Sequence, residues 1–100
     1  MKNAMEIIVS AFETAHRTGE TLFIAFTYGM RFEIFSSDYG LKLKLMHALE
    51  ACKSITYEEV MAAKKMFEAG KAFGKVSYHC AEDTDISVDR EEVWMFHNFS

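Results

Sequence analysis

The stretch Thr21–Phe35, TLFIAFTYGMRFEIF, decides the fold of this 100-residue chain. Its residues alternate with a period of two on both sides of Gly29, and most of them are aromatic, aliphatic or β-branched, as is typical of strands. A glycine between two such runs is a common hairpin signal. The sequence therefore predicts two antiparallel strands joined by a turn near Tyr28 and Gly29.

The same alternation predicts which side chains face the core, because successive side chains of a strand point to opposite faces of the sheet. The predicted core-facing residues are Leu22, Ile24, Phe26, Met30, Phe32 and Ile34. Phe23 and Phe35 then point to the other face. If helices cover one face alone, these two rings are exposed, and exposed aromatic patches usually mark a partner or a dimer contact. The alternative is that a helix or the N-terminus covers this second face.

The apolar run 93–99 predicts a further strand, which adds to the second face either Trp94 and Phe96 or Val93 and Met95. Both pairs are apolar, so alternation does not choose between them. We assign the aromatic pair to the candidate partner-binding surface, beside the two phenylalanines of the first hairpin.

Helical periodicity appears on either side of this hairpin. In the segment 3–17, apolar residues recur every three or four positions and Gly19 follows as a stop signal. The segment 41–53 is ambiguous, because leucine and lysine alternate from Leu41 to Leu45 as they would in a strand. Its length without a breaker and its Leu, Lys, Met and Ala content favour a helix, with Ser37 or Asp38 as its cap.

A third helix has the clearest start signal in the chain. Thr56 and Glu59 have the spacing of a capping box, and Ile55 and Val60 flank it as a hydrophobic staple. Gly70 is the expected stop. The carboxylates of the first turn, at positions 58 and 59, have a structural explanation, because negative charge stabilises the N-terminal end of a helix.

The segment Glu82–Glu92 lies between an expected strand at 76–80 and the last strand. Its six carboxylates are Glu82, Asp83, Asp85, Asp89, Glu91 and Glu92, and they are opposed by Arg90 alone. The other 89 residues carry nine acids and ten bases, so the formal net charge of −4 comes from this segment. Asp and Glu are poor strand formers, so we expect a long loop, with a short strand at 86–88. Such concentrated charge bears on association, which makes this loop a second candidate for partner binding.

The element order is α-β-β-α-α-β-β. It predicts one compact α+β domain over residues 1–100, with a four-stranded, mainly antiparallel sheet and about three helices on one face. Half of the residues are hydrophobic, which supports a core, and no apolar run approaches the roughly 18 residues that a membrane span requires. The N-terminus lacks the features of a secretory signal, and Cys52 and Cys80 are too far apart for a CxxC motif. We therefore expect a cytoplasmic protein with reduced cysteines.

Metal and cofactor sites are not expected from the residue spacing. Asp83 and Asp85 resemble the start of a calcium loop, but Val88 stands where that loop needs glycine and Trp94 where it needs glutamate. His79 and His97 lie on the two strands expected to pair, but structural zinc normally takes four ligands. Cys80 next to His79 would point to the other face.

Catalysis and direct nucleic-acid binding are also not expected. Neither cysteine lies in a sequence that resembles a nucleophile loop. Residues 42–75 carry seven lysines against four glutamates, but the chain as a whole is acidic and has no arginine cluster.

The sequence favours a small non-enzymatic protein that binds a protein partner through the acidic loop and the apolar sheet face. One candidate partner is a basic nucleic-acid-binding protein. The most concrete form is a stoichiometric inhibitor of the kind that phages encode, an anti-defence or anti-CRISPR-like protein. This is an expectation from size and charge and not from a motif. The first alternative is a dimeric adaptor or a subunit of a regulatory complex, and the third hypothesis is a small enzyme that uses His79 and His97.

Overall fold

The computed structural model describes residues 3–68, 77–81 and 93–98. Its elements in chain order are α1 (Ala4–Thr18), β1 (Leu22–Thr27), β2 (Phe32–Ser36), α2 (Tyr39–Glu50), α3 (Tyr57–Glu68), β3 (Ser77–Ala81) and β4 (Val93–His97). The predicted α+β class, with three helices and an antiparallel sheet, is confirmed. The acidic segment and the strand expected at 86–88 lie outside the described residues.

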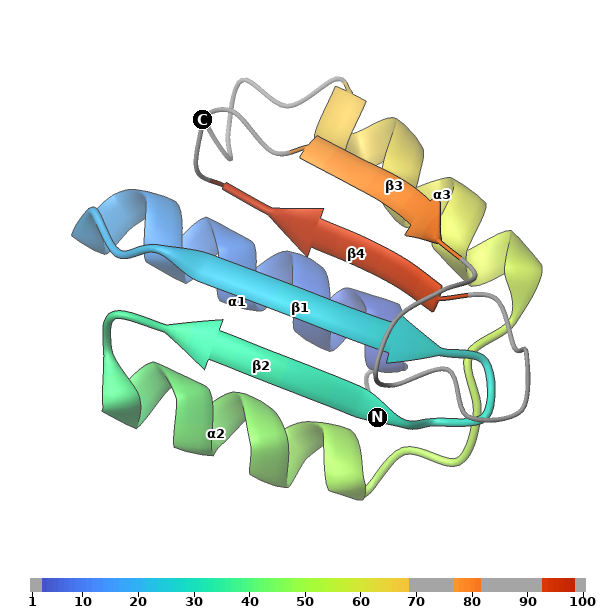
Figure 1. The fold of residues 1–100 in the computed structure, drawn as a ribbon, viewed down its shortest axis with the longest axis horizontal. Coiled ribbons are helices and arrows are strands. Elements are labelled where there is room, and N and C mark those ends of the chain that lie inside the picture. The colour runs from blue at the N-terminus through green and yellow to red at the C-terminus, as the bar shows by residue number, and fades with distance from the viewer. Residues whose placement is uncertain (1–2, 69–76, 82–92, 99–100) are drawn as a thin grey trace.

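The sheet has the strand order β2-β1-β4-β3, and each neighbouring pair is antiparallel. The helices pack on one side of it, with α1 behind β1 and α2 alongside β2 (Figure 1). The pairing of β1 with β4 joins distant parts of the chain. Asn98, just after β4, fixes this junction, because its side-chain oxygen accepts from the Leu22 N–H at 2.8 Å and its amide nitrogen donates to the Glu20 carbonyl at 2.9 Å.

Both ends of α1 and the start of α3 follow their sequence signals, while the stop expected at Gly70 lies outside the described residues. Asn3 caps α1 by accepting from the Glu6 N–H at 2.8 Å, and Gly19 ends it in the left-handed conformation at φ 72°. At α3 the capping box is formed in both directions, with distances of 3.2 and 3.3 Å between Thr56 and Glu59. Both residues of the predicted staple are buried there.

The ambiguous segment is helical, as the sequence favoured. Asp38 caps α2 by accepting from the Gly40 N–H at 2.9 Å. Leu45 and Leu49, one turn apart, are the buried residues of α2, so its contact with the core follows the helical period and not the two-residue alternation. Cys52 was expected within this helix but lies just beyond the cap residue Ala51, partly buried against the core.

The turn of the first hairpin contains one strained residue. Thr27 and Arg31 close it, because the Thr27 N–H donates to the Arg31 carbonyl at 2.9 Å. Met30 has a φ of 63°, in the left-handed region that non-glycine residues rarely occupy. The predicted turn near Tyr28 and Gly29 is thus confirmed, but the left-handed position falls on Met30.

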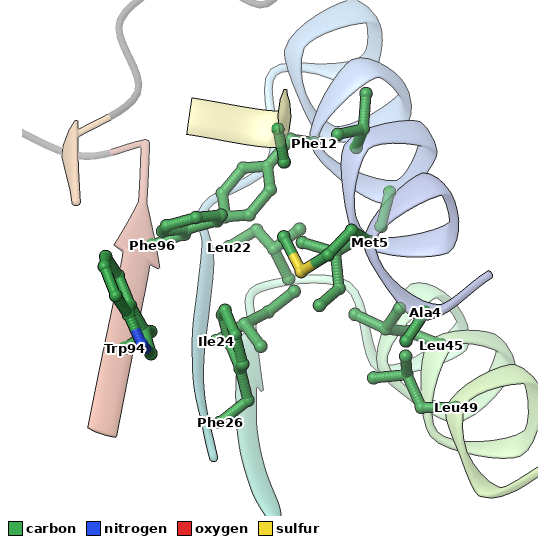
Figure 2. Packing of buried hydrophobic residues seen from close by; sticks show 14 of the residues in the cluster. Ala4, Met5, Phe12, Leu22, Ile24, Phe26, Leu45, Leu49, Trp94 and Phe96 are labelled. Atoms are coloured by element: carbon green, nitrogen blue, oxygen red, sulfur yellow. The ribbon is translucent and has the colours of Figure 1, made fainter. Parts of the chain in front are cut away.

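The core is centred on aromatic rings that connect the helices to the sheet (Figure 2). The Phe67 ring of α3 lies between Phe12 of α1, at a centroid distance of 5.4 Å, and Phe96 of β4, at 4.8 Å. Phe96 also meets Phe26 of β1 at 5.4 Å, and all three contacts are edge-to-face. Each such pair stabilises the fold by about 0.5–1.5 kcal/mol beyond the area that it buries.

Candidate functional site

The helix-free face of the sheet is built from alternate residues of β2, β1 and β4. One row across it runs from Phe35 through Phe23 to His97, and the next runs from Glu33 through Ala25 to Met95. We call the three apolar side chains around Ala25, namely Phe23, Phe35 and Met95, the open-face cluster.

Exposure within the open-face cluster is uneven. Phe35 is 59% exposed on β2, an outer strand of the sheet. Phe23 and Met95 are partly buried and pack against Ala25 and Val93, which are both buried. The cluster therefore has a well-packed base and one ring that keeps most of its surface in water. Removing that ring from water would be favourable by roughly 25 cal/mol for each Å² covered.

The assignment of Trp94 and Phe96 to this face is wrong. Phe96 is fully buried and Trp94 is 8% exposed, and both belong to the core cluster between the sheet and the helices. Figure 2 shows both rings among the other core side chains. The other pair left open by the sequence, Val93 and Met95, lies on the helix-free face. The aromatic pair was placed wrongly because both sides of β4 are apolar, so hydrophobicity carries no signal for its orientation.

The acidic candidates Glu82, Asp83, Asp85, Asp89, Glu91 and Glu92 lie outside the described residues. The residues that flank them are described, however. Ala81 and Val93 are partners in the ladder between β3 and β4, and Val93 is also the partner of Thr27. The acidic segment is therefore joined to the sheet at the end where the β1–β2 turn lies.

The two histidines are not direct partners across their ladder. The register pairs His97 with Ser77 and His79 with Met95, so the histidines are offset by two positions. Among residues 3–68, 77–81 and 93–98, no group of three or more His, Cys, Asp or Glu side chains is placed to hold a metal ion. The thiol of Cys52 donates to the Ala48 carbonyl at 3.5 Å.

A second surface was not predicted from the sequence. A groove of about 560 Å³ runs between α1 and α3. Its floor and walls are apolar or small, and four carboxylates stand along it: Glu6, Glu13, Glu58 and Glu59. Each of these was visible in the sequence, but their common position depends on how the two helices pack.

Comparison with protein-family models, with curated proteins and with solved structures finds no match for this chain. Within its described part, no helix combines the length and the hydrophobicity needed to cross a membrane.

Proposed function

We propose that this chain, folded as a two-layer domain with a four-stranded sheet and its helices on one face, is a small non-enzymatic, cytoplasmic protein-binding module. It acts by stoichiometric binding, and its most concrete role is that of a phage-type anti-defence or anti-CRISPR-like inhibitor. The proposal rests mainly on the exposure of Phe35, whose side chain is 59% exposed although it adjoins the packed residues of the helix-free face. A dimeric adaptor is the alternative.

The open-face cluster supports binding to a protein more than to a small ligand. Its exposed aromatic ring lies beside partly buried apolar neighbours on a sheet, and protein interfaces are enriched in aromatic and methionine side chains at their centres. Methionine adapts its shape to a partner because its side chain is unbranched and flexible.

The acidic segment supplies the second part of the proposal. It carries five net negative charges and is joined to β3 and β4 at the end of the sheet near Thr27. A protein that bound both the cluster and this segment would need a basic surface beside an apolar one. Nucleic-acid-binding proteins have basic surfaces of this kind, and carboxylates on an inhibitor could occupy their phosphate sites.

The test compares Phe35→Thr with Tyr57→Thr, because both aromatic residues are 59% exposed and Tyr57 lies on α3, in the helical layer. Proteins captured from the native host by the unmodified chain are quantified against both variants. We expect one captured protein to be retained by Tyr57→Thr and lost by Phe35→Thr. We also expect the unmodified chain to inhibit this protein at a 1:1 ratio. Equal capture by all three proteins would refute the assignment. Concentration-dependent sedimentation that Phe35→Thr abolishes would instead support the dimer.

A further inference from the structure

We propose that the groove between α1 and α3 is a docking site for a basic amphipathic helix of a protein partner. This surface is separate from the open-face cluster, because it lies in the helical layer and shares no residue with the helix-free face. The inference goes beyond the proposed function and does not depend on it.

The floor of the groove is closed and apolar. Met5 and Val9 of α1 and Ala63 of α3 are 2%, 7% and 3% exposed, so the groove ends on packed side chains. Ala62 and Met66 stand higher on the α3 side, and Met66 is 49% exposed. A large, flexible apolar side chain left half in water beside a hydrophobic floor is typical of surfaces that accommodate an apolar ligand.

The shape of the groove fits a helix. Its lining residues recur every three or four positions, from Asn3 to Glu13 on α1 and from Glu58 to Met66 on α3. At a rise of 1.5 Å per residue these stretches are about 15 and 12 Å long. The two helices run in the same general direction (Figure 1), and Phe12 contacts Phe67 near the C-terminal ends of the two lining stretches. An elongated apolar groove of this kind accepts a ridge of side chains spaced at i, i+4 and i+7.

The charge of the groove determines the kind of helix. Among the described residues, four carboxylates and no lysine or arginine line it, so an occupant meets glutamates on both α1 and α3. The helix dipole accounts for Glu6, Glu58 and Glu59, which lie in first turns, and Glu59 also belongs to the capping box. It does not account for Glu13, in the third turn of α1. Lysine or arginine on the flanks of the docked helix would complement all four.

The experiment uses fluorescent peptides of about 14 residues, long enough to span the groove as a helix. One peptide has leucines at i, i+4, i+7 and i+11 with lysines on either side. A second has glutamates in place of the lysines, and a third has the first composition in scrambled order. Binding is measured by fluorescence anisotropy from low to high salt. We expect the basic amphipathic peptide to bind, the acidic one not to bind, and the scrambled one to bind at least tenfold more weakly.

Matched variants locate the site. Ala62 is exposed, so Ala62→Trp adds a ring to the groove without disturbing the core, and Ala51→Trp adds the same ring at the exposed end of α2. Glu13→Gln with Glu58→Gln removes two charges from the groove, whereas Glu33→Gln with Glu50→Gln removes two from elsewhere. Each groove variant should weaken peptide binding on the order of tenfold at low salt, and each control by less than about twofold.

Three results would overturn the proposal. If the groove variants and the control variants lost peptide affinity equally, the binding would be general charge attraction. The same conclusion would follow if the scrambled peptide bound as tightly as the basic amphipathic one. A wild-type dimer that Ala62→Trp dissociates would show that a second copy occupies the groove. Methyl NMR gives an independent readout, because the exposed Met66 resonance should shift on peptide binding while that of Met46, on α2, should not.

Discussion

Replacing Phe96 by leucine tests both the centre of the core and the orientation of β4. The ring is fully buried and makes edge-to-face contacts with Phe26 at 5.4 Å and with Phe67 at 4.8 Å. Leucine keeps most of the apolar area but loses both aromatic contacts, which contribute about 0.5–1.5 kcal/mol each. We therefore expect Phe96→Leu to lower the free energy of unfolding by about 1–3 kcal/mol. That is a large share of the roughly 5–15 kcal/mol typical of such a domain.

The matched control is Phe35→Leu, the same substitution on the opposite face. Phe35 is 59% exposed, so its loss should change stability by less than about 0.5 kcal/mol. Urea unfolding followed by circular dichroism measures both, and a loss of 2 kcal/mol moves the midpoint by roughly 1–2 M when the slope is unchanged.

A double-mutant cycle with Phe67→Leu isolates the ring contact itself. The coupling between positions 67 and 96 should be about 0.5–1.5 kcal/mol, because the two rings touch. Equal midpoints for Phe96→Leu and Phe35→Leu, or a coupling near zero, would refute the placement of Phe96 between the sheet and the helices.

Three further predictions concern the backbone and its anchors. Met30 has a φ of 63°, so Met30→Gly should be more stable than Met30→Ala by about 1 kcal/mol in urea unfolding. Both variants lose the side chain, but only alanine keeps the backbone strain. Alanine is usually the more stable of the two residues, and finding that order here would contradict the prediction. Gly19→Ala should lower the free energy of unfolding by about 1 kcal/mol or more in the same assay, because φ is 72°. A Cβ at this position meets no atom within 4 Å, so the loss reports backbone strain and not a clash. An unchanged stability would mean that α1 ends differently. Asn98→Ala leaves the N–H of the buried Leu22 without its acceptor and should lower the free energy of unfolding by about 1–3 kcal/mol. Hydrogen exchange at the Leu22 amide should become faster, which makes it the specific measurement.

Local signals in the sequence predicted the parts of the fold that local chemistry controls. The capping box at Thr56, the left-handed cap at Gly19 and the hairpin around Gly29 each depend on residues a few positions apart. The helix over α2 required weighing a short alternation against a longer helical pattern, and the buried Leu45 and Leu49 explain why the helical pattern prevailed.

The orientation of β4 could not be predicted in the same way. Its residues Val93–His97 are apolar on both sides, and its neighbour β1 is distant in sequence. The register is fixed by pairing with β1 and by the bonds of Asn98 to Leu22 and Glu20, none of which leaves a pattern within the strand. A strand with two apolar faces is oriented by its long-range contacts. The sequence therefore placed Phe23 and Phe35 on the candidate surface correctly but could not decide which residues of β4 lie beside them.

The distribution of charge shows that long-range packing also limits what the sequence can predict about binding surfaces. Counted along the sequence, the negative charge lies in the segment Glu82–Glu92, and the rest of the chain is almost balanced. Folding brings part of this charge together, because four of the nine remaining acids, and no lysine or arginine of the described residues, line the groove between α1 and α3. The four carboxylates come from two helices about fifty residues apart, and three of them have a local explanation as first-turn residues. A charged surface that helps to choose a partner can therefore arise from residues that each look structurally ordinary in sequence, and its recognition requires the packing of the helices.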